Sequence, residues 1–405
     1  MDIASVRSDF PLLAARPDLA YFDSAATAQR PACVLEAGRR FYEETNANPL
    51  RGLYDLSQAA TDAYESAREE VRRFLGAAES GEIIFTRNAT ESLNLVAYSY
   101  GQHLSPGDEI VVSVLEHHSN LLPWQQLAAR AQARLRLVPV TADGRITEEA
   151  FRRELSCRTK IVAMAHVSNV LGTENDIRLF ARLAHKAGAV FVCDGAQSVP
   201  HLPVNVRNLD VDFLAFSGHK MGGPMGIGVL YGKKELLQAM PPFLTGGEMI
   251  EYVTKTSATW AELPHKFEAG TVNAAGAVGL AAAIRYLNGL GWDEIVRREE
   301  ELSEKTFEAL TAIPHLHILG SPAAADHHGI FSFTIDGVHP HDIAEILNAD
   351  GVCVRAGHHC AQVLMQELHV PSTARVSVSF LNTEDEIGRL AKCLASVRER
   401  MGYAE

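Results

Sequence analysis

Between about residues 83 and 231, seven short runs rich in β-branched and aromatic residues alternate with segments of helical periodicity. The runs are EIIF, EIVVSVL, LRLVPV, KIVAMAHV, AVFVCD, VDFLAF and GIGVLY. Strands that alternate with helix-length connections pair in parallel, because each connection has to cross back over the sheet. The alternation therefore predicts an α/β fold in which a mostly parallel seven-stranded sheet lies between helices.

A change of pattern near residue 290 divides the chain into a large and a small domain. Before it, the segment 59–76 carries apolar residues at three- and four-residue spacing and ends at Gly76, which predicts an amphipathic helix with a glycine terminus. After it, a charged helix is followed by short strands and helices. The expected parts are an N-terminal segment that packs with the small domain (1–14), a large domain (15–290) and a small α+β C-terminal domain (291–405).

Composition and charge exclude several classes of function. The formal net charge is −13 at pH 7 and no segment is basic enough to bind phosphates, so we expect no nucleic-acid partner. No stretch approaches the roughly 20 apolar residues of a membrane span, and MDIASVRSDF at the start has no apolar signal segment. We therefore expect a cytoplasmic protein without a membrane partner. The six cysteines form no C-x-x-C pair, which disfavours disulfides and a thiolate zinc site, and no metal is expected.

Polar residues end several of the expected strands, and ligands of open α/β sheets bind outside those carboxyl ends. Asp194 follows the apolar run AVFVC, which would strip solvent from its carboxylate. Such a carboxylate needs a cationic partner, for which a protonated pyridine nitrogen would serve. The alternative is that Asp194 caps the next helix. Gln197 lies three residues further on and is placed to face the same ligand.

The next strand end offers an amine and a set of phosphate contacts. Lys220 lies between the apolar run VDFLAF and the glycine-rich GGPMGIG. Its amine can therefore be held in a pocket and made reactive towards an aldehyde. The alternative is an ordinary surface lysine. Thr90 opens a helix whose N-terminus suits a phosphate, or it is a plain capping residue. Ser217 and His219 are placed to add contacts, and His118 to stack on an aromatic ring or to be an ordinary hydrogen-bonded histidine.

The segment RAGHHCAQ places Cys360 in a turn rich in glycine and histidine after an expected strand. Neighbouring cationic or hydrogen-bonding groups raise the thiolate fraction of a cysteine, so Cys360 is either a reactive thiol or a structural one. Arg355 and Arg375 flank it in sequence. A guanidinium group is the usual clamp for an amino-acid carboxylate, and the alternative is that both are surface arginines.

Six segments spread over nearly the whole chain, in order and at family spacing, resemble one family. The segments are EHHSN, HVSNVLGTEND, DGAQS, SGHKMGGPMGIGVLYGKK, FEAGT and RAGHHCAQ. They resemble the group II cysteine desulfurases, the SufS-type and selenocysteine-lyase branch of fold-type I pyridoxal-phosphate enzymes in the class V aminotransferase group. The short link from Arg355 to Cys360 also matches group II.

The resemblance implies a role around pyridoxal 5'-phosphate for each candidate. Lys220 would bind the cofactor as a Schiff base and later move a proton, and Asp194 would pair with the pyridinium nitrogen. Gln197 would hydrogen-bond the ring hydroxyl, and His118 would stack on the ring. The phosphate would be held by Thr90, Ser217, His219 and, in a homodimer, Thr271 of the partner subunit.

The resemblance further implies that the small domain carries the catalytic cysteine. Asn169, Arg355 and Arg375 would orient L-cysteine, and Cys360 would take its sulfur as a persulfide while L-alanine leaves. The sulfur would pass to an acceptor protein of SufU or SufE type for iron–sulfur cluster assembly. GVHPHDIAEIL resembles relatives in which the residue matching His341 helps open the acceptor's zinc site; the alternative is a simple helix start capped by Asp342.

Other readings of the same residues stay open at this point. One is a selenocysteine lyase, or another lyase or aminotransferase of the same fold that does not use Cys360. Another is a weakened protein that acts only as a partner in cluster assembly. The chain also departs from the family pattern in four places: Leu50 to Tyr54 in place of H-R-G-x-H, Ala89 in place of threonine, Met225 in place of threonine, and Val272 in place of proline.

Overall fold

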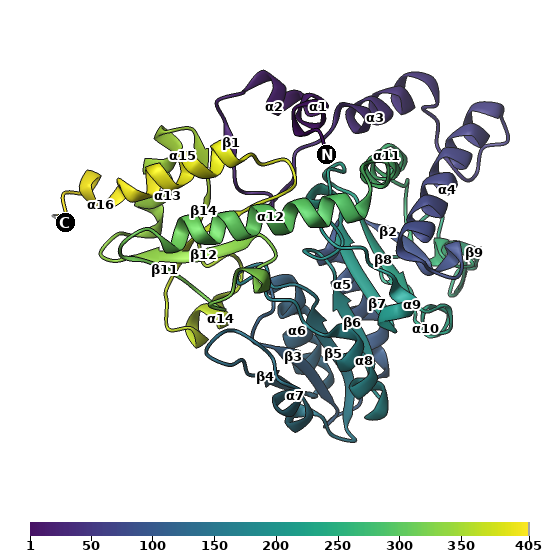
Figure 1. The fold of residues 1–405 in the computed structure, drawn as a ribbon. Helices are drawn as coiled ribbons and strands as arrows, with labels where there is room; N and C mark the ends of the chain where they lie inside the picture. The colour runs from purple at the N-terminus through teal and green to yellow at the C-terminus, as the bar shows by residue number, and fades with distance from the viewer. Residues whose placement is uncertain (404–405) are drawn as a thin grey trace.

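The computed structural model describes residues 1–403 and contains the seven-stranded sheet that the alternation predicts (Figure 1). Its strand order is β2-β8-β7-β6-β5-β3-β4, and β8 runs antiparallel to both of its neighbours while the other pairs are parallel. The prediction of a mostly parallel sheet is therefore confirmed. The strands are β2 (Ile83–Thr86), β3 (Glu109–Ser113), β4 (Arg134–Val138), β5 (Thr159–Ala165), β6 (Val190–Asp194), β7 (Phe213–Ser217) and β8 (Gly228–Gly232).

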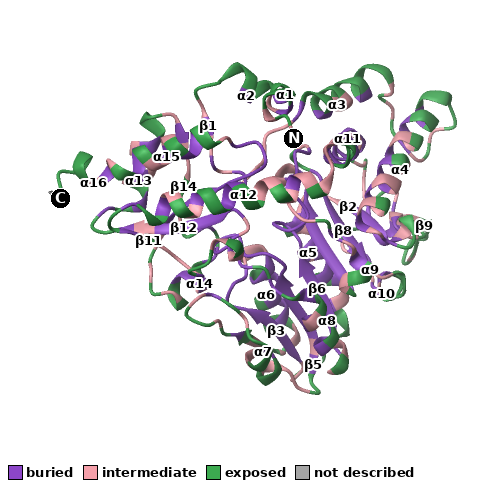
Figure 2. Cartoon of the chain, viewed as in Figure 1, coloured by how far each residue is buried: buried purple, intermediate pink, exposed green. Residues whose placement is uncertain are grey.

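Helices cover both faces of this sheet, and its strands are almost wholly buried except for the edge strand β4 (Figure 2). Every residue of β3, β6 and β7 is buried because both faces pack against apolar helix stripes, which is why these strands read as continuous apolar runs. The predicted helix at 59–76 is α4 (Asp55–Leu75), and Gly76 ends it with φ +68 in the left-handed region. The other helices of the large domain are α3 (Ala32–Glu44), α5 (Ala89–Ser99), α6 (Leu122–Ala131), α7 (Glu148–Glu154), α8 (Ile177–Lys186), α9 (Val206–Leu209), α10 (Lys234–Ala239) and α11 (Ala274–Leu290).

The small domain is built on a four-stranded antiparallel sheet of order β11-β12-β15-β14. A long helix, α12 (Trp292–Thr311), runs from the large domain along this sheet (Figure 1). The other elements are β11 (Leu316–Ile318), β12 (Ile330–Ile335), α13 (Pro340–Ala349), β13 (Val352–Cys353), β14 (Arg355–Gly357), α14 (Gln362–Glu367), β15 (Thr373–Ser377), α15 (Glu384–Ala395) and α16 (Val397–Arg400).

The N-terminal segment contacts the small domain. Arg7 of α1 (Ile3–Ser8) pairs with Glu386 of α15 at 2.9 Å, and β1 (Ala20–Tyr21) adds to β13 in parallel. The contacts continue beyond residue 14, because Asp23 bridges to Ser377. This segment therefore brings an acidic side chain close to the small-domain sheet. The remaining elements are α2 (Pro11–Ala15) and an exposed hairpin, β9 (Ile250–Val253) and β10 (Ala258–Trp260).

Within residues 1–403, no helix combines the length and the apolar character that crossing a bilayer requires.

Candidate active site

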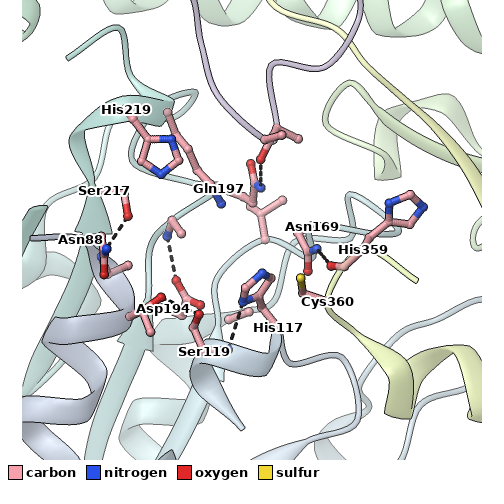
Figure 3. Close-up of a pocket in the computed structure, with 18 of the residues that line it drawn as sticks. Asn88, His117, Ser119, Asn169, Asp194, Gln197, Ser217, His219, His359 and Cys360 are labelled. Carbon is pink, nitrogen blue, oxygen red and sulfur yellow. Dashed lines mark hydrogen bonds between the residues drawn. The ribbon is translucent and has the colours of Figure 1, made fainter. Parts of the chain in front are cut away.

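A cavity opens at the carboxyl ends of the central strands, between the large and the small domain (Figure 3). The large domain lines it with the residues that end β6 and β7 and with the N-terminus of α5, while β14, β15 and the turn before α14 close the other side. The sequence-predicted residues that meet here are Thr90, Asn169, Asp194, Gln197, Ser217, His219, Lys220, Arg355, Cys360 and Arg375. Strand ends far apart in the chain thus come together at one edge of the sheet.

Lys220 lies in the short 3-10 helix Gly218–Lys220 that follows β7. Burial lowers the pKa of its amine to about 8, although Asp194 acts in the opposite direction. A minor but reactive fraction of the amine is therefore uncharged near neutral pH. Lys220 lines the cavity and is half-buried rather than free in solvent, so the surface-lysine alternative is wrong.

Asp194 is the last residue of β6 and is 5% exposed. Its Oδ1 accepts a hydrogen bond from the Ala196 N–H at 2.9 Å, and no helix follows it, so the capping alternative is wrong. Burial raises the pKa of this carboxyl, while the Ala196 N–H and Lys220 act to lower it. Within residues 1–403 no ion pair joins Asp194 directly. The carboxylate can therefore take a cation from a ligand.

Gln197 is 4% exposed and lies beside Asp194 in the same turn. Its Nε2 donates to the Ala25 carbonyl at 2.8 Å, while its Oε1 is buried and has no partner among the described residues. A buried acceptor without a donor is costly unless a ligand supplies one. Gln197 is therefore placed to accept from a hydroxyl in the cavity.

The N-terminus of α5 forms one end of the cavity. Asn88 caps this helix, with its side chain accepting from the Glu91 N–H at 3.0 Å, so Thr90 is not the capping residue. The Thr90 hydroxyl instead lies 2.7 Å from that of Ser119, and the Ser217 hydroxyl accepts from the Ala89 N–H at 2.9 Å. Free N–H groups and hydroxyls at a helix N-terminus bind anions.

His219 lies beside this anion end, and its Nδ1 is 3.3 Å from the Thr27 hydroxyl. Burial, followed by the nearby charges of Lys220 and Arg30, lowers the pKa of the imidazole to about 4. The ring is therefore neutral at physiological pH and can donate one hydrogen bond to an anion without adding a charge.

Of the two adjacent histidines 117 and 118, it is His117 that lines the cavity, whereas the sequence favoured His118 (Figure 3). The 3-10 turn His118–Asn120 begins right after His117 and turns consecutive side chains in different directions. Burial, followed by the nearby charge of Lys220, lowers the pKa of His117 to about 3. His118 instead faces the small domain, where its Nε2 lies 3.1 Å from the Gln362 N–H.

The two arginines converge on Asp23, which the sequence analysis did not single out. Arg355 Nε and Nη2 lie 3.0 and 2.9 Å from the two Asp23 oxygens, and Arg375 Nη2 lies 3.4 Å from Oδ1. Arg375 is 2% exposed, so the surface alternative is wrong for Arg375, whereas the Arg355 side chain is 46% exposed where it pairs with Asp23. Its Nη1 donates to the Asn169 carbonyl at 2.8 Å, and its Nε has no partner among the described residues.

Cys360 is exposed at the mouth of the cavity, with its sulfur on the Asn169 side (Figure 3). It stands in the turn that joins β14 to α14. Two other predicted residues lie outside this cavity: Thr271 is exposed near the N-terminus of α11, and His341 is exposed in the first turn of α13. His339, not Asp342, caps α13.

The cavity fits pyridoxal 5'-phosphate group by group. A buried carboxylate without its own cation faces the place for a pyridinium nitrogen, and the orphaned Gln197 Oε1 suits the ring hydroxyl. The α5 N-terminus with its hydroxyls suits the phosphate, and a partly uncharged lysine suits the aldehyde. The residues present therefore match the donors and acceptors of this cofactor.

Known proteins resemble the chain over its full length. A model of the aminotransferase class-V family matches residues 20–390. A probable cysteine desulfurase of Halalkalibacterium halodurans is 48% identical and is covered at 100% on both chains. One of Staphylococcus aureus (strain Mu50) is 49% identical over 99% of this chain and 98% of its own.

Solved structures agree with this assignment. The apo structure of cysteine desulfurase from Thermococcus onnurineus NA1 has a TM-score of 0.94 at 40% identity and 98% coverage of both chains. Cysteine desulfurase CsdA from Escherichia coli has a TM-score of 0.92 at 39% identity and 99% coverage of both chains. The chain therefore belongs to the class-V aminotransferase family, and within it to the group of the cysteine desulfurases.

Proposed function

We propose that this protein is a pyridoxal-phosphate-dependent cysteine desulfurase of the group II, SufS type, which converts L-cysteine to L-alanine and holds the sulfur as a persulfide on Cys360. The observation that carries the proposal is that Lys220 and Cys360, which stand on different domains, line the same cavity. The full-length relatives called cysteine desulfurases support it. The reaction needs an amine and a thiol within reach of one substrate.

Each cofactor contact follows from a property of the residue that makes it. When bound, pyridoxal phosphate supplies an aldehyde and an electron sink for negative charge at the substrate Cα. Lys220 would hold it covalently, because its partly uncharged amine is nucleophilic. Asp194 would pair with the ring nitrogen and Gln197 with the ring hydroxyl. His117 would lie on the ring face as a neutral imidazole. Thr90, Ser217 and His219 would hold the phosphate.

The substrate side would work through charge and position. Arg375 and Arg355 would bind the cysteine carboxylate, and Asn169 would help to fix its orientation. Once Lys220 has accepted the proton from the substrate Cα, the Cys360 thiolate attacks the substrate sulfur. A sulfur–sulfur bond forms and the carbon–sulfur bond breaks. The carbon skeleton then takes up one proton at Cβ and regains one at Cα, and it leaves as alanine.

Mass spectrometry of the protein incubated with L-cysteine tests this function. We expect a mass increase of one sulfur atom, located on the peptide that contains Cys360, together with release of alanine. A Cys360→Ala variant should still bind the cofactor but should lose this modification and nearly all turnover. Full turnover by that variant would refute the role of the thiol and would favour a lyase that does not use Cys360.

A homodimer is part of the proposal, and one face of the large domain supports it. Large apolar side chains that would normally be buried are exposed there, in the loop before α4 and around the β9 hairpin: Leu53, Tyr54, Leu244, Tyr252 and Val253. The two segments are neighbours, because Arg51 Nε lies 2.7 Å from Glu248 Oε2. Several exposed apolar side chains grouped on one face mark a protein interface.

Thr271 belongs to the same face, which supports its assignment to the partner's phosphate site. The Gly270 N–H donates to the Gly247 carbonyl at 3.0 Å, and this places the exposed Thr271 next to the loop that carries Leu244. Sedimentation velocity should therefore give the mass of a dimer. A Tyr252→Glu variant should shift towards monomer and bind the cofactor more weakly, while an unchanged dimer would argue against this face.

The last parts of the proposal are a sulfur acceptor of SufU or SufE type, a role in iron–sulfur cluster assembly and a cytoplasmic location. His341 is exposed beside His339 at the start of α13, where a partner protein can reach it. His341→Ala should lower the rate of sulfur transfer to a SufU-type acceptor and leave persulfide formation on Cys360 unchanged. Equal rates of transfer would assign contact with the acceptor to another surface.

A further inference from the structure

The turn that carries Cys360 has a backbone that needs support from outside. His359 and Cys360 have φ of +50 and +56, so two consecutive residues other than glycine occupy the left-handed region. Such a conformation is uncommon in residues with a Cβ and persists where surrounding contacts hold it. α14, which follows this turn, has no side-chain cap of its own at Ala361.

Three hydrogen bonds from the large domain hold this turn. Asn169 Nδ2 donates to the His359 carbonyl at 2.8 Å, and the His118 N–H donates to the Cys360 carbonyl at 2.6 Å. The Gln362 N–H at the start of α14 donates to His118 Nε2 at 3.1 Å. His118 therefore contacts the turn twice, at the carbonyl of the cysteine through its backbone and two residues further on through its ring.

We infer that His118 is a positioning residue, whose imidazole caps α14 from the large domain and thereby holds Cys360 in its attacking conformation. This inference rests on the proposed function, because it assigns to Cys360 the attack on sulfur. The ring serves as an acceptor, so its Nε2 must carry no proton. Because the cap joins two domains, it also keeps the cysteine turn docked over the cavity.

The surroundings of His118 favour the unprotonated ring. The rings that face it are His358 of the small domain, at 5.6 Å between centroids, and His117 of its own segment, at 6.4 Å. Burial, and then the charge of His358, lowers the pKa of His118. The cap is therefore intact at neutral pH. It is lost as the pH falls through this lowered pKa, because protonation turns the acceptor into a donor that faces another donor.

The test compares His118→Phe, which keeps the ring volume without an acceptor, with His118→Gln, whose amide oxygen reaches about as far as Nε2. Single-turnover mass spectrometry would measure the rate of persulfide formation on Cys360 at saturating L-cysteine. We expect this rate to fall about tenfold in His118→Phe, because one hydrogen bond contributes a factor of about ten. In His118→Gln the rate should return to within about threefold of the wild-type rate. Cofactor occupancy and KM should stay unchanged in both variants.

A pH series and a matched control complete the test. The wild-type rate relative to that of His118→Gln should fall as the pH is lowered, because glutamine does not titrate. His103→Phe, at an exposed histidine near Tyr100, should behave as the wild type. Equal rates in His118→Phe and the wild type, or no rescue by glutamine, would overturn the inference. So would loss of cofactor binding in His118→Phe, because the residue would then serve the fold.

These outcomes are distinct from failure of the proposed function. If the wild-type protein forms no persulfide on Cys360, the proposed function itself fails, whatever the His118 variants do. If the wild type forms it and only the His118 variants depart from expectation, the function stands and the positioning role alone is wrong.

Discussion

Replacing Glu268 with glutamine would remove one charge from a buried network that joins α4 to the edge strand β2. Glu268 Oε1 accepts from Arg68 Nη1 and from the Phe85 N–H, both at 2.7 Å, and Oε2 accepts from Arg68 Nη2 and the Tyr64 hydroxyl, both at 2.8 Å. The Arg68 side chain is 0% exposed. Burial alone would lower the pKa of this guanidinium, but the Glu268 carboxylate more than offsets it and holds the pKa well above its ordinary value.

The expected loss in the free energy of unfolding follows from the four contacts. A glutamine side chain keeps one acceptor oxygen and turns the other position into an N–H₂ donor. The amide oxygen would still accept from Arg68 Nη1 and from the Phe85 N–H. The amide nitrogen would face the Tyr64 hydroxyl, which can rotate to accept a hydrogen bond. It would also face Arg68 Nη2, which is itself a donor and cannot accept one. Arg68 keeps Glu65 as a partner at 2.9 Å. We therefore expect about 3 kcal/mol, the lower end of the cost of breaking a buried ion pair.

Urea denaturation at fixed protein concentration would measure this loss from the shift in midpoint at unchanged slope. The matched control is Glu36→Gln, which removes an exposed ion pair to Arg39 on α3 and should leave the midpoint unchanged. Arg68→Met combined with Glu268→Gln should recover part of the stability, since no unpaired charge then stays buried. A loss below about 1 kcal/mol for Glu268→Gln alone would refute the reasoning.

Three further outcomes are expected. The rate at which the apo protein binds pyridoxal phosphate should rise with pH, because only the uncharged Lys220 amine reacts and the pKa of that amine is about 8. Stopped-flow absorbance would measure this rate, and a rate that does not change with pH would contradict the prediction. Gly172→Ala should lower the free energy of unfolding by more than about 3 kcal/mol. Gly172 has a φ of +70, and the new Cβ would lie 1.6 Å from the His327 carbonyl oxygen. The urea midpoint would measure the loss of stability. Asp23→Asn should lower the free energy of unfolding by about 2–4 kcal/mol, because Arg375 loses the carboxylate that it pairs with. The same change should tighten the binding of L-alanine in calorimetry, since Arg375 is then free to bind the carboxylate of the ligand. Weaker binding would contradict this.

The fold was largely predictable because burial on both faces leaves a plain signal. The seven apolar runs coincide with β2 to β8 to within about two residues, and Gly76 ends α4 as expected. The strand ends also predicted Asp194, Ser217 and Lys220, since in an α/β sheet the polar residue after an apolar run falls at the ligand edge. These are properties of local sequence combined with one general rule of topology.

The parts that were missed depend on contacts that local sequence does not encode. His117 and His118 are adjacent and identical in type, and only the direction of the 3-10 turn that follows decides which ring enters the cavity. Asp23 lies 332 residues before Arg355, in a segment that reads as an ordinary connection. Asn88 could have been found, because an asparagine three residues before a glutamate at a helix start is a common cap.

The charge of the cavity is opposite to that of the chain. The chain carries a formal net charge of −13, yet the cavity gathers three cationic side chains, Lys220, Arg355 and Arg375. Two carboxylates face them: Asp194 lines the cavity, and Asp23 pairs with both arginines. The histidines that line it do not add to this charge, because burial lowers their pKa to about 3 or 4; they are His117, His219 and His359. The positive charge is therefore fixed in position by groups that titrate well above neutral pH or near 8. The two expected ligands are anionic, since the cofactor carries a phosphate and the substrate a carboxylate. The positive field that attracts them would persist across the physiological pH range, and the neutral imidazoles would make contacts that need no charge.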